Sequence, residues 1–227
     1  MSKYLVMEDG KMILINKELR WTSFDVVKKI RNLFKIKKVG HAGTLDPLAT
    51  GLLIICIGKM TKQINQFMNL EKEYTGTMVL GKTTPSVDLE TEIVSENSTE
   101  HITDEEVICT AKKFSGKLMQ VPPIYSAIKK GGERLYKKAR KGEDIKIDPR
   151  EVEAKEFEIT DIKIPEVKFR LVCSKGFYVR SLVRDFGEIL GVGAYMSELE
   201  RTRIGDFKLE DALTIDEFMK ELENINS

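Results

Sequence analysis

One carboxylate stands apart from every other charge in its neighbourhood. Asp46 lies in the stretch GHAGTLDPLATGLL, and no other charged side chain occurs between His41 and Lys59. The proline that follows excludes the α conformation for Asp46, and the glycines on both sides favour a tight loop. An aspartate held extended on such a loop can serve as a nucleophile or a base, although an isolated Asp-Pro more often hydrogen-bonds its own turn. A chemical role for Asp46 therefore requires partners elsewhere in the chain.

Two other residues are candidate partners. Arg180 lies at the beginning of an amphipathic helical stretch, where its charge opposes the helix dipole, and Arg184 one turn later adds like-charge repulsion. We therefore expect an anionic group to neutralise the charge of Arg180. The alternative is that Arg180 is an ordinary surface arginine whose small energetic cost is tolerated. Tyr74 stands at the head of a predicted strand, where the alternative is an ordinary half-buried strand aromatic.

Basic residues are concentrated in two segments although the net charge is only +1. The segment KKIRNLFKIKKVGH carries six Lys and Arg residues and no acid, and SAIKKGGERLYKKARKG carries seven against Glu133 alone. Such segments are typical of a surface that follows a phosphate backbone, but they also occur as solvated helix faces.

Composition excludes several classes of protein. With 227 residues and 41% hydrophobic content the chain can bury a core, and no segment approaches the roughly 18 apolar residues of a membrane span. We expect a cytoplasmic protein without a membrane anchor. Three distant cysteines, Cys56, Cys109 and Cys173, suggest buried thiols, and two histidines without a ligand spacing predict no metal site and no cofactor.

Hydrophobic periodicity predicts strands with helices inserted between them, in no regular βαβ order. This pattern favours an α+β fold with a mainly antiparallel sheet. A slip of phase near Thr160 indicates a β-bulge. The first helix should be capped by Thr22 and bury Phe24, Val27, Ile30 and Leu33. The expected strands are 11–16, 52–58, 72–81, 152–164 and 168–173, and the expected helices are 23–34, 103–114 and 178–191.

Four segments resemble the successive motifs of the bacterial tRNA pseudouridine synthases of the TruB family. They are GHAGTLDPLATGLLIICIGKMTK, KEYTGTMVLGKTTPSVDLE, VPPIYSAIKKGGERLYKKARKG and CSKGFYVRSLVRDFGEILG, and the likeness runs from about Lys11 to Ile215. The resemblance implies the pseudouridine synthase fold, with flanking helices and a basic thumb insertion at about 122–148. It implies a single catalytic domain over 1–227 that lacks the carboxy-terminal RNA-binding domain of longer relatives.

The resemblance also implies an activity, the isomerisation of uridine 55 in the tRNA T-loop to pseudouridine. Asp46 matches the catalytic aspartate, Tyr74 the tyrosine that stacks on the target base, and Arg180 the arginine that pairs with the aspartate. The residues matched to substrate binding are His41, which helps reshape the T-loop, Leu199, which packs on the base, Lys17, and the thumb lysines Lys129, Lys130, Lys137 and Lys138. The implied partner is the tRNA T-arm, bound by a monomer without a guide RNA.

These residue types suit the chemistry. Isomerisation breaks the bond from N1 to the sugar, turns the base and joins C5 to the same carbon. The carboxylate can attack the sugar or the base, or remove a sugar proton, and a neighbouring arginine keeps it ionised after water is excluded. An aromatic platform with an apolar wall holds the detached base without fixing its rotation.

The chain departs from the family pattern in its first motif. Where relatives show DKPxGxTS, this chain has NKELRWTS, so Asn16, Glu18 and Arg20 replace the acid, the proline and the glycine. Because of these replacements, the family motif does not predict the backbone conformation of this turn. Two alternatives also remain: a non-catalytic module that binds and folds the T-arm, and a guide-RNA-dependent enzyme.

Overall fold

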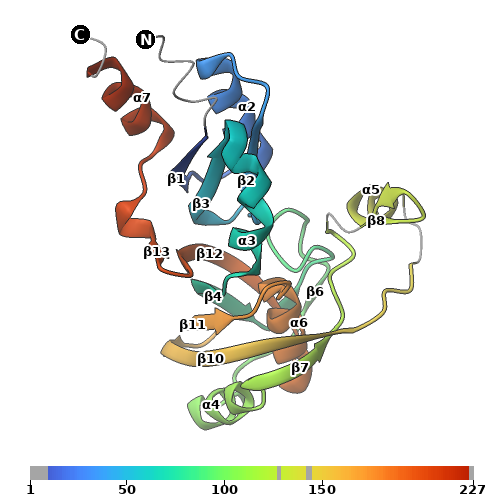
Figure 1. The fold of residues 1–227 in the computed structure, drawn as a ribbon. Coiled ribbons are helices and arrows are strands. Elements are labelled where there is room, and N and C mark those ends of the chain that lie inside the picture. Colours follow the sequence, from blue (N-terminus) through green and yellow to red (C-terminus); the bar gives the residue numbers. More distant parts are fainter. Residues whose placement is uncertain (1–9, 127–128, 142–144, 225–227) are drawn as a thin grey trace. The chain divides into compact units, whose positions relative to one another are not determined.

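The computed structural model describes residues 10–126, 129–141 and 145–224, and the chain divides into two compact units (Figure 1). One unit contains Met1–Thr75 and Leu199–Ser227, and the other contains Gly76–Glu198. Strands β4 (Lys72–Leu80) and β12 (Ala194–Ile204) each run from one unit into the other along the chain.

The first unit is built around strand β3 (Thr50–Ile57). Strand β1 (Lys11–Lys17) pairs with β3 in the antiparallel sense from Lys11↔Ile57 to Lys17↔Gly51, and β2 (Val39–Ala42) is also antiparallel to β3. β12 joins β3 in parallel at Glu200↔Thr50 and lies between β3 and β4 in the strand order. The remaining elements are α2 (Ser23–Phe34), η1 (Gly58–Gln63), α3 (Ile64–Asn69), β13 (Phe207–Lys208), η2 (Leu209–Asp211) and α7 (Ile215–Asn224).

Helix α2 has the predicted bounds and cap but a different buried face. Thr22 and Asp25 form a capping box, in which each side chain binds the other residue's backbone N–H. The buried stripe contains Val26, Val27, Ile30 and Phe34, which pack on Ile15, Leu53, Ile55 and Phe218. The prediction that Phe24 and Leu33 are buried is wrong, since they are 59% and 37% exposed. Phe34 at the end of the helix supplies the large apolar group on the buried side instead.

The second unit places an aromatic cluster between its sheet and two helices. Its strands are ordered β12-β4-β11-β10-β7, with β7 (Gly116–Gln120), β10 (Arg150–Lys163) and β11 (Glu166–Cys173). Phe157 on β10 contacts Phe169 on β11, Phe186 of α6 (Val179–Ile189) and Phe114, which follows α4 (Asp104–Lys112). Phe114 also stacks on Phe186. The predicted bulge is confirmed as a register shift between Ile159 and Asp161. A short hairpin of β5 (Lys82–Thr83) and β6 (Ser95–Glu96) completes the unit.

The basic insertion forms a small hairpin followed by a helix. Strands β8 (Lys129–Lys130) and β9 (Glu133–Arg134) pair across Gly131 and Gly132, whose φ angles of 64° and 83° suit a two-residue hairpin turn. Helix α5 (Leu135–Arg140) follows directly, and Lys141 forms an ion pair with Glu133 at 2.9 Å.

The α+β class and the mainly antiparallel sheet are confirmed, with β3–β12 as a parallel pair. Cys56 and Cys173 are buried as predicted, whereas the prediction is wrong for Cys109, which is exposed on the outer face of α4. Within the described residues, no helix is both long enough and apolar enough to cross a bilayer.

The turn between β1 and α2 closes with a left-handed residue that is not glycine. Arg20 has a φ angle of 68°, and it stands where the similar motif carries glycine. Its N–H donates to the Pro47 carbonyl at 2.7 Å, which holds the turn against the loop that carries Asp46. The left-handed conformation costs a residue with a Cβ atom about 1–2 kcal/mol.

We predict that Arg20→Gly stabilises the protein by a few tenths to about 1 kcal/mol. Glycine removes the left-handed penalty but loses roughly 0.5–1 kcal/mol to its greater freedom in the unfolded chain. Urea unfolding would measure the change. The matched control is Leu19→Gly, one residue earlier and without a positive φ, which should lower the free energy of unfolding. A destabilised Arg20→Gly protein would mean that the arginine side chain offsets its backbone cost.

Candidate active site

The loop that carries Asp46 connects β2 to β3. His41 pairs with Ile55 and Ala42 with Ile54, so the two strands fix both ends of the loop. The Asp46 carbonyl accepts a hydrogen bond from the Ala49 N–H at 3.1 Å, which closes the turn around Pro47. The Asp46 side chain is half-buried. The loop is thus a tight excursion from a buried sheet.

Helix α2 supports the same loop through a buried serine. Ser23 Oγ accepts from the Leu45 N–H at 2.9 Å and donates to the Leu45 carbonyl at 3.2 Å. Ser23 is the first residue of α2 and is 2% exposed. Because Thr22 caps the helix, the Ser23 hydroxyl is available to hold the residue before Asp46.

Lys17 is enclosed beneath the loop. Its side chain is 0% exposed, and its Nζ donates to the carbonyls of Trp21 at 2.6 Å, Glu18 at 3.0 Å and Pro47 at 3.4 Å. Burial lowers the pKa of Lys17 to about 8, while the Asp46 carboxylate acts in the opposite direction. Lys17 therefore remains mostly protonated at neutral pH and supplies a positive charge on the protein side of Asp46.

Arg201 holds the two ends of the loop together. It is 1% exposed, its Nε donates to the Leu52 carbonyl at 2.7 Å, and its Nη2 donates to the Gly43 carbonyl at 3.0 Å. A Cβ atom on Gly51, whose φ is 100°, would lie 2.4 Å from the Arg201 carbonyl oxygen. The close approach of β12 to the loop therefore requires glycine at this position.

His41 lies beside this group of cations. Burial and, secondarily, the charge of Arg201 lower the pKa of His41 below its usual 6.5. The imidazole is therefore neutral at pH 7 and can both donate and accept a hydrogen bond. A neutral ring suits contact with nucleobases better than a point charge.

Tyr74 and Leu199 lie on neighbouring strands of the first unit. Tyr74 on β4 and Leu199 on β12 are 9% and 8% exposed. The Leu199 carbonyl accepts from Thr50 Oγ1 at 3.5 Å, directly after the Asp46 loop. At the start of β4, Lys72 donates to the carbonyls of Met68 and Leu70. The Thr50 contact therefore links the strand that carries Leu199 to the end of the Asp46 loop.

Arg180 is buried in the second unit rather than exposed at the surface. It is 3% exposed, and its Nη1 and Nη2 donate to the carbonyls of Ser86 and Tyr125, each at 2.8 Å. Asp88, which is 1% exposed, lies 3.6 Å from Nε. Asp88 thus supplies the compensating anion that the position of Arg180 at a helix start requires, and the guanidinium plane is fixed from three directions.

The segment that holds Arg180 is itself strained. Val87 lies between Ser86 and Asp88 with a φ angle of 61°, which is a genuine outlier for a β-branched residue. Thr84 Oγ1 and Ser86 Oγ both donate to the Asp88 carbonyl, at 2.6 and 3.2 Å, and the Met196 N–H donates to the Val87 carbonyl. These bonds hold the strained turn in place.

The predicted site residues are divided between the two units. The first unit brings together Lys17, His41, Leu199 and the Asp46 loop, with Tyr74 two strands from β3. The second unit holds Arg180, and its insertion carries the thumb lysines: Lys129 and Lys130 on β8, and Lys137 and Lys138 on α5. Sequence reasoning did not identify Arg201 or Asp88, although Asp88 lies in the motif KEYTGTMVLGKTTPSVDLE.

Metal coordination is not suggested by the side chains of this site. Across residues 10–126, 129–141 and 145–224, no group of three or more His, Cys, Asp and Glu side chains is placed to hold an ion.

Comparison with known proteins identifies the family. Residues 31–179 match the TruB family pseudouridylate synthase (N terminal domain), and residues 180–226 match the tRNA pseudouridylate synthase B C-terminal domain. A tRNA pseudouridine synthase B from Flavobacterium johnsoniae is 50% identical over 95% of this chain and 97% of its own length. The protein of that name from Clostridium tetani is 44% identical over 92% of this chain but only 73% of its own length.

Solved structures share the fold. A crystal structure of a Cbf5-Nop10-Gar1 complex matches all of this chain with a TM-score of 0.77 and 28% identity, and this chain spans 58% of that longer one. A structure of an H/ACA RNP bound to a substrate RNA containing 2'-deoxyuridine matches 99% of the chain with a TM-score of 0.72 and 27% identity. The predicted pseudouridine synthase fold is confirmed by these likenesses. With half of its residues identical to a curated relative of nearly equal length, the chain belongs to the TruB family of tRNA pseudouridine synthases.

Proposed function

We propose that this protein isomerises uridine 55 in the T-loop of tRNA, with Asp46 as the catalytic carboxylate. The observation that carries the proposal is the construction of the Asp46 loop, whose carbonyls at Gly43, Pro47 and Leu52 are held by two buried cations. An aspartate that only stabilised its own turn would not need such support. The 50% identity to a tRNA pseudouridine synthase B along nearly the whole chain supplies the substrate class.

The reaction exchanges one bond of C1' for another. The bond from C1' to N1 breaks, the base turns, the bond from C1' to C5 forms, the hydrogen on C5 leaves as a proton, and the released N1 takes up a proton. An ionised carboxylate is required whether Asp46 attacks C1', attacks the base or removes a sugar proton. The charge of Lys17 favours the ionised form of Asp46, because opposite charges attract strongly where water is excluded.

The detached base must be retained without being fixed in one orientation. In this proposal the ring of Tyr74 stacks on the uracil and Leu199 forms the apolar wall. Neutral His41 contacts the reshaped T-loop. Since the target base begins inside folded RNA, its extrusion costs a few kcal/mol, which phosphate contacts from the thumb offset.

Arg180 is proposed to pair with the Asp46 carboxylate, as the family resemblance implies. The planar guanidinium is already oriented by Ser86, Tyr125 and Asp88. Such fixation reduces the entropy lost when the group forms a further charge-assisted contact. The strained turn at Val87 would then serve to keep this orientation.

We infer that the enzyme acts on tRNA as a monomer, in the cytoplasm, without a metal ion or a guide RNA. The identity of about 50% to proteins named tRNA pseudouridine synthase B exceeds the 27–28% to chains from H/ACA complexes. The competing proposal is a non-catalytic module that binds and folds the T-arm. It explains the basic insertion but gives no reason for the buried cations around Asp46.

Asp46→Asn should abolish tritium release from C5 of labelled tRNA while folding and tRNA affinity survive. Asparagine keeps the size and much of the hydrogen bonding of the loop residue but cannot act as a nucleophile or a base. Tritium release, thermal unfolding and filter binding should be measured on the same preparations. Asp206→Asn, an exposed aspartate of the same unit, is the matched control and should behave as the parent.

The alternatives give different results in that experiment. If Asp46 only stabilised its turn, the Asn variant would turn over at a sizeable fraction of the parent rate, and the mechanism above would be wrong. A non-catalytic module would release no tritium from the parent protein either.

Replacing Arg180 should separate its structural role from its catalytic role. Arg180→Met leaves the buried Asp88 carboxylate without its ion pair, and the loss of stability should reach roughly 3–5 kcal/mol. Arg180→Met combined with Asp88→Asn should recover part of this stability but not the turnover. Urea unfolding and tritium release measure the two effects. Recovery of turnover in the double variant would reject the pairing of Arg180 with Asp46.

Neutralising the thumb should weaken tRNA binding and its salt dependence. Each phosphate contact contributes about 0.9 to the log–log slope of affinity against salt on duplex targets. Changing Lys129, Lys130, Lys137 and Lys138 to Gln should therefore flatten this slope. The control changes four exposed lysines of the same unit, Lys112, Lys113, Lys117 and Lys163, to Gln. Equal slopes in the two variants would place the RNA-binding face elsewhere.

A further inference from the structure

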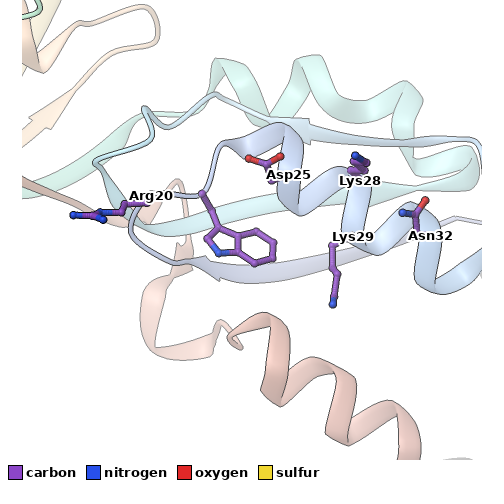
Figure 2. Close-up of a pocket in the computed structure, with 6 residues that line it drawn as sticks. Arg20, Asp25, Lys28, Lys29 and Asn32 are labelled. Carbon is purple, nitrogen blue, oxygen red and sulfur yellow. The ribbon is translucent and has the colours of Figure 1, made fainter. Parts of the chain in front are cut away.

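A pocket of about 410 Å³ lies on the first unit, over the turn before α2 and most of the length of that helix (Figure 2). Arg20 lies on the turn, and Lys28, Lys29 and Asn32 lie along the helix. Nothing in the proposed catalysis uses these side chains. The pocket is therefore a second feature of the surface that needs an explanation.

The pocket is cationic, and its one acid is already engaged. Arg20, Lys28 and Lys29 are exposed and carry three positive charges. The Asp25 carboxylate accepts from the Thr22 N–H at 2.9 Å and from Thr22 Oγ1, as the acidic partner of the capping box. These bonds hold the pKa of Asp25 below its usual value. The occupant that complements the pocket is therefore an anion.

Trp21 adds an aromatic surface to the same pocket. It is half-buried and packs against the apolar core of the first unit, so its ring is anchored on one side. The Trp21 backbone is also held in place. Its carbonyl accepts from Lys17 Nζ at 2.6 Å, and its backbone N–H donates to the Glu18 carbonyl at 3.4 Å. A fixed indole beside three cations is the combination by which proteins bind unpaired nucleotides, with the base stacked and the phosphate neutralised.

Backbone strain at Arg20 is a separate observation on the same pocket. A residue with a φ angle of 68° is more easily accommodated as glycine, yet the chain places a long cationic side chain there. Strain of this kind concentrates at functional positions, where the side chain has a use that offsets its conformational cost.

We propose that this pocket binds an unpaired nucleotide of the substrate tRNA, with the base against Trp21 and successive phosphates of its strand contacted by Arg20 at one end of the pocket and by Lys28 and Lys29 along the helix (Figure 2). The Asn32 amide, which both donates and accepts, is placed to contact the base edge. The proposal rests on the proposed function, because it takes tRNA as the polyanion that the protein meets. It adds a contact separate from the Asp46 loop and from the thumb.

The only tryptophan of the chain makes the test direct. A base stacked on Trp21 should quench the intrinsic fluorescence, so titration with unmodified tRNA should produce a saturable loss of signal. Its midpoint should equal that of tRNA binding measured by filter retention. A single-stranded oligouridylate should quench with lower affinity, and inorganic phosphate alone should not quench.

Two variants test the cationic groups. Lys28→Gln combined with Lys29→Gln should weaken the tRNA-induced quenching and lower the salt slope by about 1.4, since each contact to single-stranded RNA contributes about 0.7. Arg20→Gly should weaken quenching even though it stabilises the fold. The control, Lys112→Gln with Lys113→Gln at the end of α4, carries the same charge change and should leave the quenching midpoint and slope unchanged.

The outcomes separate this inference from the proposed function. Saturable binding and tritium release without any change in Trp21 fluorescence would overturn the pocket and leave the enzyme intact. If the Lys28/Lys29 double variant and the Lys112/Lys113 double variant weaken the quenching equally, the effect comes from general surface charge. That result would also overturn the pocket. Quenching by tRNA that the pocket variants weaken, in a protein that releases no tritium, would support the pocket and reject the catalytic proposal.

Discussion

Two buried cations hold the loop on which the proposed chemistry depends. Lys17 and Arg201 donate to backbone carbonyls at both ends and in the middle of the segment 43–52. Burying an ammonium and a guanidinium is costly unless each is hydrogen-bonded, and carbonyl oxygens satisfy them without adding a second carboxylate. The positive charge therefore stays available to Asp46. One arrangement thus fixes the position of the aspartate and also favours its ionised form.

Elements governed by short-range physics were predictable from the sequence. The Thr22 cap of α2 and the bulge near Thr160 depend on neighbours only a few residues apart. The buried face of α2 was not predictable in the same way. Phe24 and Leu33 fit a helical stripe as well as Val26 and Phe34 do, and only the packing of α2 on Ile15 and Phe218 selects between the two stripes. Helical periodicity shows that a stripe exists, while tertiary contacts decide its orientation.

Charged residues with distant backbone partners were the part that sequence reasoning could not reach. Arg201 lies in the stretch ERTRIG and resembles an exposed strand residue, but its acceptors are 149 and 158 residues away. Asp88 similarly meets Arg180 across the fold of the second unit. No local pattern marks a carbonyl as the partner of a cation. The motif KEYTGTMVLGKTTPSVDLE contains Asp88, but the resemblance gave no role to Asp88 or to Arg201, and only the folded structure shows what each of them contacts.

Two of the three described non-glycine residues with a positive φ angle lie beside a group that must be oriented, and the third, Lys35, ends α2. Val87 separates the two residues that hold Arg180, and Arg20 adjoins the turn that holds Lys17. The Arg20 N–H also donates to the Pro47 carbonyl, which Lys17 Nζ contacts from within the protein. A nucleotide resting on Trp21 would therefore press on the residue whose carbonyl accepts from Lys17. Because that lysine also contacts the residue after Asp46, a short chain of hydrogen bonds connects the pocket over α2 to the catalytic loop. In this proposal the left-handed conformation of Arg20 is the conformational cost of one turn that both contacts RNA and supports the Asp46 loop.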